Sequence, residues 1–424
     1  MSYFPKWQVK TSGVIAPDET LPANQTIALG IQHVVAMFGS TILAPILMGF
    51  DPNVAVLMSG IGTLIFFLMV GGRVPSYLGS SFAFIGVVIA ATGYAAGSGL
   101  NPNIEVALGG IMACGIVYFL VGVIVTLTGV AWIEKLMPPV VTGAVVAVIG
   151  LNLAPTACKS VGTSSFNAWI TILSVLCVGG VAVYTRGFIQ KLLILVGLLI
   201  AYVIYAILTN GLGLGQPIDF SLISNAAWFG LPHFHHPEFR ADAILLIVPV
   251  VIILIAENLG HVKAVTAMTG RNLDPYMGRA FMGDGLATIV SSSMGGTGVT
   301  TYGENIGVMA ATRVYSTLLF PVAAALAILL GFSPKFGALI QTIPIVVFGL
   351  IAVSGARIWV ENHVDFSQNR NLIVAAVTLI LGAGDFSLSI GGFTIGGIGT
   401  ATFGAILLNA LMTPGERMGQ KKNS

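Results

Sequence analysis

Residues 300–313 read Thr300-Thr301-Tyr302-Gly303-Glu304-Asn305-Ile306-Gly307-Val308-Met309-Ala310-Ala311-Thr312-Arg313, a polar, glycine-bearing stretch in a very apolar chain. Apolar runs of about 20 residues, the length that crosses a bilayer, recur on both sides of it. A carboxylate at bilayer depth costs at least ~2.5 kcal/mol on insertion scales, so a chain that keeps one there usually uses it. We therefore expect this stretch to carry the functional site of a membrane protein.

The composition excludes an ordinary soluble protein. Of 424 residues, 56% are hydrophobic and 8% are charged, and the mean hydropathy is +0.94, whereas soluble domains are roughly one-quarter charged. The net charge of +2 is too small to suggest a nucleic-acid partner. Residues 1–23 lack the apolar core of a cleavable signal peptide. The partners expected from composition are membrane lipid and a small solute.

Hydropathy and turn residues predict an all-α integral membrane protein with about fourteen transmembrane segments. Those at 80–93, 280–293 and 301–312 are short and broken by glycine, as are the discontinuous segments of transporters. The fourteen predicted segments are 24–48, 53–70, 80–93, 106–128, 137–154, 168–185, 191–209, 243–260, 280–293, 301–312, 315–332, 343–356, 371–383 and 396–412.

The positions of Lys and Arg orient these segments. With the N-terminus in the cytoplasm, only Lys159, Arg240 and Lys335 of the 18 Lys and Arg residues fall outside. This positive-inside bias supports an even number of spans with both termini cytoplasmic. It makes 1–23 and 413–424 cytoplasmic tails and 213–242 an extracytoplasmic loop.

A weak internal repeat relates the two halves of the chain. The segment 79–84 and the segment 299–304 each contain a pair of small residues followed by an aromatic residue, at an offset of 220 (301 minus 81). With about seven spans in each half, the halves would have opposite orientation, which is a 7+7 inverted repeat. We expect Ser81-Phe82 and Thr301-Tyr302 to face each other as short antiparallel strands in segments 3 and 10.

Five ionisable residues are interpreted as intramembrane: His33, Glu257, His261, Asp284 and Glu304. Glu257 and His261 share a helix face because they are four residues apart. Buried acids facing a bundle interior mark ion or substrate paths, although a hydrogen-bonded pair that fixes helix packing is the alternative. Both histidines fit either role. Asp284 begins its span and is expected at the cytoplasmic interface, in a structural or gating role.

Other motifs do not indicate an enzyme or a metal site. The cluster His233-Phe234-His235-His236 lacks further ligands at regular spacing and is interpreted as a solvated loop. The glycines at 295–298 and 391–399 lack the strand-to-helix context of a phosphate loop. Cys114, Cys158 and Cys177 are interpreted as buried thiols. No nucleophile and base, metal ligands or cofactor motif emerges, so we predict no catalytic residues and no cofactor other than protons as coupling ion.

Residues 304–313 match the signature of the nucleobase-ascorbate transporter (nucleobase-cation symporter type 2) family at every fixed position. This signature is Gln or Glu, Asn, any residue, Gly, four residues of any kind, Thr, then Arg, Lys or Gly. Gln32-His33, Ala36–Gly39, Pro75–Phe84 and Ala256–His261 support the match. The chain resembles the uracil and pyrimidine permease branch over essentially its whole length.

The resemblance implies two domains with the substrate between them. Its core domain would comprise 24–128 and 243–333, and its gate domain 129–212 and 334–412. It further implies a homodimer through the gate domain, in a bacterial inner membrane. One departure concerns Ile343 to Ala356, which rises only ~20 Å at 1.5 Å per residue, short of the ~30 Å hydrocarbon core. Either this gate helix is broken or about eight residues are missing between Pro344 and Ile345, judged by that length.

The resemblance and the chemistry of a nucleobase imply the same residues. Carboxylates accept hydrogen bonds from ring N–H groups, an extended backbone donates to ring carbonyls, and aromatic side chains stack on the ring. If Glu257 and Glu304 lie close together, they would titrate as a coupled pair. The predicted substrate-binding residues are Glu257, Glu304, Phe82, Tyr302, Gly303 and Ser81, and the predicted proton-coupling residues are Glu304, His33, Glu257 and His261.

The predicted function is proton-coupled uptake of pyrimidine nucleobases, uracil first and thymine next. A purine, xanthine or urate permease of the same fold is one alternative, and an inorganic anion as cargo is another. A channel is the alternative of a different class.

Overall fold

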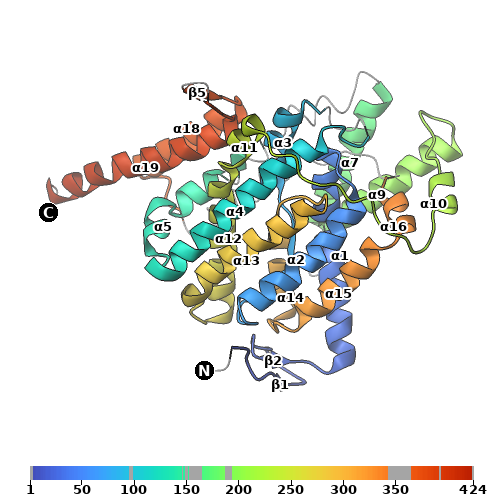
Figure 1. Ribbon diagram of the computed structural model, residues 1–424, viewed down its shortest axis with the longest axis horizontal. Coiled ribbons are helices and arrows are strands. Elements are labelled where there is room, and N and C mark those ends of the chain that lie inside the picture. Colours follow the sequence, from blue (N-terminus) through green and yellow to red (C-terminus); the bar gives the residue numbers. More distant parts are fainter. Residues whose placement is uncertain are drawn as a thin grey trace.

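The computed structural model describes residues 3–94, 99–145, 147–148, 151, 165–186, 193–341, 364–390 and 393–422. It is mainly helical (Figure 1). The α-helices are α1 (Ala23–Met48), α2 (Pro52–Met69), α3 (Ile85–Thr92), α4 (Ile104–Thr128), α5 (Ala131–Leu136), α7 (Ser165–Tyr184), α9 (Leu193–Ala206), α10 (Ser221–Asn225), α11 (Ala241–Ile247), α12 (Val250–Thr269), α13 (Met277–Ser293), α14 (Gly303–Thr312), α15 (Leu319–Gly331), α16 (Pro334–Gln341), α18 (Asn369–Ala383) and α19 (Gly397–Lys422).

Short elements connect these helices. Three are single turns of tighter or wider helix: η1 (Phe82–Phe84), η2 (Ile207–Gly211) and η3 (Asp274–Tyr276). The strands are β1 (Gln8–Val9), β2 (Glu19–Thr20), β3 (Leu78–Ser80), β4 (Val299–Thr301), β5 (Leu388–Ile390) and β6 (Phe393–Ile395). They pair as β1 with β2, β3 with β4 and β5 with β6. Short sheets at both ends of the chain were not expected from its sequence.

Several helices are suited to a membrane. Within the described ranges, Ala23–Met48, Pro52–Met69, Ile104–Thr128 and Ala241–Thr269 are each long and apolar enough to cross one, and α15 and α16 form a pair bent by 88°. Ala241–Thr269 extends nine residues beyond the predicted end at residue 260 (269 minus 260). Polar side chains beyond residue 260 have partners within the protein: His261 contacts Thr301, and Lys263 pairs with Glu134 and Asp274. The total of fourteen spans stays a prediction, since 343–356 and part of 137–154 lie outside the described residues.

Helices from the two halves of the chain pack against each other. Helix α4 packs on α13, α2 on both α13 and α15, and α1 on α15, and Figure 1 shows these helices running side by side through the centre of the molecule. Small residues allow the close approach, as is usual between membrane helices. A Cβ added at Gly285 would lie 2.5 Å from the backbone nitrogen of Phe119.

The boundaries predicted for the core domain and the gate domain stay a prediction.

A short antiparallel pairing joins the halves at the centre. Leu78 pairs with Thr301 and Ser80 with Val299, and the N–H of Ser81 adds a 2.9 Å bond to the carbonyl of Gly298. The predicted piece Ser81-Phe82 lies beyond the end of β3 at Ser80, and Tyr302 lies one residue beyond the end of β4 at Thr301. Ser81 instead accepts a bond from the N–H of Ala83 and begins η1, because a hydroxyl at this position caps a helix. Tyr302 likewise precedes α14 directly.

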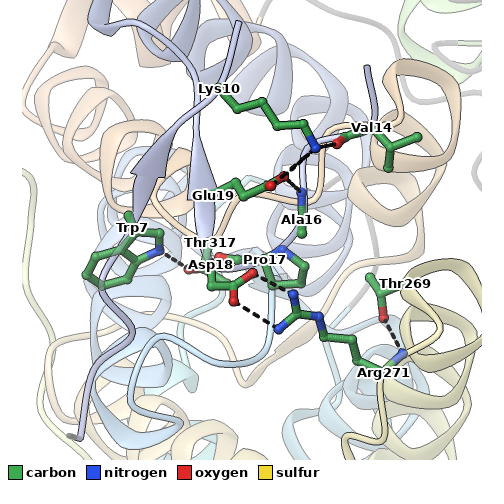
Figure 2. Close-up of polar contacts among 10 residues, drawn as sticks. All are labelled: Trp7, Lys10, Val14, Ala16, Pro17, Asp18, Glu19, Thr269, Arg271 and Thr317. Atoms are coloured by element: carbon green, nitrogen blue, oxygen red, sulfur yellow. Dashed lines mark hydrogen bonds and ion pairs between the residues drawn. The ribbon is translucent and has the colours of Figure 1, made fainter. Parts of the chain in front are cut away.

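The N-terminal segment is docked rather than free (Figure 2). The indole nitrogen of Trp7 donates to Thr317 Oγ1 at 2.9 Å, and Ile15 forms a parallel bridge with Val314. The carboxylate of Asp18 accepts two bonds from Arg271, of 2.6 and 3.1 Å. The region predicted only as a polar tail therefore holds the loops that follow α12 and α14.

Glu19 stabilises the fold of this segment. Its carboxylate accepts a 2.8 Å bond from the N–H of Ala16 and pairs with Lys10 at 3.0 Å. These two contacts lower the pKa of Glu19 below its ordinary value of 4.5. A lowered carboxyl pKa stabilises the folded state above the unfolded pKa, and this contribution is lost as pH falls through the folded value. The contact is therefore intact at neutral pH.

Candidate functional site

Glu304 lies in the first turn of α14, next to the end of β4. Tyr302 is the extended N-cap residue, with φ −109° and ψ 126°. The chain thus passes from a strand to a helix within two residues, leaving Gly303 exposed and Glu304 half-buried. The N-terminus of a helix favours a negative charge. The local fold therefore places an acid and an open backbone position side by side.

The partner of the Glu304 carboxylate is a residue that the sequence reasoning missed. The hydroxyl of Ser40, in the middle of α1, donates to Glu304 Oε1. Ser40 is only 2% exposed. The one signal available in the sequence was a small polar residue within an apolar span, which is common enough to pass unnoticed.

His33, predicted to act with Glu304, contacts the neighbouring residue of the signature. The side-chain nitrogen of Asn305 lies 3.0 Å from His33 Nδ1 and donates to the His33 carbonyl at 2.9 Å. The imidazole also lies 5.0 Å from the ring of Phe320. His33 and Asn305 are both buried. The structure therefore places His33 beside α14 through Asn305, and its role in proton coupling stays a prediction.

Glu257 reaches the same region from α12. Its Oε2 accepts a 3.4 Å hydrogen bond from the hydroxyl of Ser81, which follows β3, and α12 packs against α14, the helix that carries Glu304. Both acids are half-buried, as is Phe82. The structure thus brings together Glu257, Glu304, Ser81 and Phe82, which come from three separate segments.

His261 lies one turn beyond Glu257 and faces the second strand. Its Nδ1 is 2.9 Å from the hydroxyl of Thr301. A Cβ added at Gly303 would lie 3.3 Å from His261 Nε2. Glu257 and His261, the pair spaced i, i+4, thus both lie near the junction of β4 and α14. The imidazole of His261 lies next to the exposed backbone of Gly303.

Tyr302 is packed inside the protein. Its hydroxyl donates to the carbonyl of Ser80 at 2.9 Å and accepts from Thr41 Oγ1 at 3.1 Å. The side chain is 4% exposed, and a Cβ added at Gly79 would lie 2.4 Å from its Cζ. Tyr302 therefore holds α14 against α1 and β3, and its predicted ring contact with a substrate stays a prediction.

Asp284 is not at an interface with water, as had been expected, but fully buried at 0% exposure. Its Oδ2 accepts bonds from Asn258 at 2.7 Å and Thr300 at 3.3 Å. Helix α13 begins at Met277, so Asp284 lies in its middle, where Gly283 and Gly285 let α2 and α4 approach closely. Asp284 therefore joins α12, α13 and β4.

The histidine-rich loop shows no clustered ligands. In the described part of the chain, no group of three His, Cys, Asp or Glu residues could hold a metal ion. His235 lies instead 3.9 Å from Glu105. Cys158 and the pair Gly391-Gly392 lie outside the described residues, as does the junction of Pro344 and Ile345.

The arrangement is rich in hydrogen-bond acceptors. Each carboxylate has about four lone-pair positions and one serine donor among its described partners, so both retain acceptor capacity. The half-buried ring of Phe82 and the exposed backbone of Gly303 lie beside them. Such a set suits a small planar ligand that carries N–H donors.

Comparisons with known proteins identify the family of the chain. The profile of the Permease family, Xan_ur_permease, matches residues 24–391. The chain is 68% identical over 422 residues to the Escherichia coli (strain K12) protein RutG, provisionally named a pyrimidine permease, covering 97% of this chain and 95% of RutG. It is 42% identical over 416 residues to the uracil permease of Paenibacillus larvae subsp. larvae, covering 93% and 96%.

Solved structures share the fold at low sequence identity. The transmembrane domain of the cyanobacterial bicarbonate transporter BicA is 16% identical, with a TM-score of 0.59, covering 86% of this chain and 97% of that domain. The murine anion transporter Slc26a9, in its inward-facing state, is 12% identical, with a TM-score of 0.60, covering 93% and 69%. These likenesses, the family match and the apolar helices identify a multi-pass membrane protein. The chain belongs to the Xan_ur_permease family, the nucleobase-ascorbate transporters, and is a transporter rather than an enzyme.

Proposed function

We propose that the protein carries pyrimidine nucleobases, uracil first and thymine next, across the bacterial inner membrane in symport with protons. The observation that carries the proposal is the position of two acids at the paired strands β3 and β4: Glu257 bonds to Ser81 after β3, and Glu304 lies in the first turn of α14 after β4. Pyrimidine and uracil permeases among the relatives support this cargo. A neutral base offers N–H donors to both carboxylates.

The substrate would bind through the groups gathered there. Glu257 and Glu304 would accept from the ring N–H groups, while the backbone at Gly303 and Phe82 would meet its carbonyls. Ser81 would position Glu257 through their 3.4 Å contact. Tyr302 would support the site from within the core, with a ring contact as its further predicted role.

Proton coupling would use the same acids. A proton on either carboxyl group reduces the repulsion between two nearby negative charges, so protonation and binding can be linked. Glu304 would be the principal carrier and Glu257 its coupled neighbour. His261 and His33 would respond through Thr301 and Asn305, their respective contacts. No cofactor besides the proton would be needed.

Two arrangements are proposed together with this function. The substrate would lie between a core domain (24–128 and 243–333) and a gate domain (129–212 and 334–412), with both termini in the cytoplasm. Two copies would associate through the gate domain.

Uptake into proteoliposomes tests the proposed function. We expect labelled uracil to accumulate when the outside is acidic, and the accumulation to collapse when a protonophore removes the gradient. Unlabelled thymine should compete more strongly than xanthine. Stronger competition by xanthine would instead indicate a purine permease, and a flux that neither saturates nor exceeds equilibrium would indicate a channel.

A further inference from the structure

Helix α1 contacts the α14 region through one face. His33, Ser40 and Thr41 are spaced i, i+7 and i+8, which places them on the same side of a helix. Their partners are Asn305, Glu304 and Tyr302, and together these contacts span the start of α14. Of the three α1 side chains, Ser40 alone contacts an acid of the proposed site.

A serine hydroxyl suits a carboxyl group that gains and loses a proton. The hydroxyl donates to an ionised carboxylate and can accept from a protonated one. The contact can therefore persist in both protonation states of Glu304. It also holds Oε1 against α1, so that Oε2 can accept from a second donor.

We propose that Ser40 is the positioning residue of Glu304, orienting its carboxyl group for the nucleobase. This inference rests on the proposed function and adds a residue to it. The two acids then share one design, because each receives a hydroxyl from the first half of the chain, Ser40 for Glu304 and Ser81 for Glu257. Ser40 lies within a rigid helix, whereas Ser81 lies at a strand end.

The test measures uracil binding to purified full-length protein in detergent. Ser40→Ala is expected to weaken binding roughly tenfold or more, since hydrogen bonds to charged groups are among the stronger ones. Ser40→Thr keeps the hydroxyl and is expected to bind within about threefold of wild type. Ser59→Ala is the matched control, because Ser59 is a fully buried helical serine bonded to Val56 and Tyr77 rather than to an acid.

The thermal midpoint of each unliganded variant separates positioning from folding. If Ser40→Thr restores uracil binding and Ser59→Ala binds uracil like the wild type, the hydroxyl of Ser40 has the proposed role, even if Ser40→Ala is less stable. Near wild-type affinity in Ser40→Ala overturns the inference and leaves the proposed function intact. A Ser40→Thr variant that is stable yet binds uracil as poorly as Ser40→Ala has the same consequence. Failure of the wild type to bind any nucleobase overturns both.

Discussion

Glu304→Gln is expected to reduce pH-gradient-driven accumulation of uracil about tenfold or more. The amide cannot take up or release a proton, and it offers one acceptor oxygen where the carboxylate offers two. The Ser40 hydroxyl can still donate to that oxygen, so the fold around α14 should persist. Initial uptake into proteoliposomes, with and without an inward proton gradient, measures the effect.

The matched control is Glu238→Gln. Glu238 is an exposed acid in the loop before α11, so its neutralisation removes the same charge without touching the site. It should accumulate uracil like the wild type. Full retention of gradient-driven accumulation in Glu304→Gln would remove Glu304 from the coupling mechanism.

Gly79→Ala is expected to disrupt the site through the backbone. The added methyl group would lie 2.4 Å from Tyr302 Cζ and 2.5 Å from Thr41 Oγ1. Tyr302 would have to move, and α14 with Glu304 begins directly after it. Overpacking of this kind costs about 1–3 kcal/mol of folding stability. We expect a lower thermal midpoint, and we expect weaker uracil binding because a shift of Tyr302 displaces Glu304, which follows it by two residues.

Gly260→Ala provides the comparison for this change. Gly260 lies on α12 near Glu257, and a Cβ added there meets no heavy atom within 4 Å. It should bind uracil like the wild type. If Gly79→Ala matches Gly260→Ala in stability and binding, the close packing of Tyr302 against β3 does not support the site.

The acids of the candidate site could be singled out from the sequence because charge within an apolar chain is rare and conspicuous. Glu257 and Glu304 stood out in an apolar chain, and the spacing of His261 indicated a shared face with Glu257. The repeat offset predicts that segments 79–84 and 299–304 lie side by side, and β3 pairs with β4 there, although Ser81 bonds to Gly298 rather than facing Thr301. These inferences needed only periodicity and the cost of burying polar groups.

The contacts of the site could not be predicted in the same way. Ser40 is one of many small polar residues in membrane helices, and only the three-dimensional packing of α1 on α14 shows that it reaches Glu304. The sequence predicts that His33 acts together with Glu304. In the structure, the residue of α14 that contacts His33 is the next one, Asn305. Asp284 is predicted at an interface because it lies near the start of the span 280–293, whereas α13 begins at Met277 and neighbouring glycines allow close packing around it.

The N-terminal segment illustrates a second limit. Its prolines and polar residues gave no periodic pattern, so the sequence predicted a tail. Its order comes from long-range contacts such as Trp7 with Thr317 and Asp18 with Arg271. No local pattern encodes partners that are about 250 to 310 residues away.

The most direct test of the account is uracil binding to purified wild-type protein and Glu257→Gln, at one acidic and one neutral pH. The account predicts that the wild type binds uracil more tightly at acidic pH than at neutral pH. It also predicts that Glu257→Gln weakens binding about tenfold or more at both. Equal affinities for the two proteins, unchanged between the two pH values, would contradict a nucleobase site built on two coupled carboxyl groups.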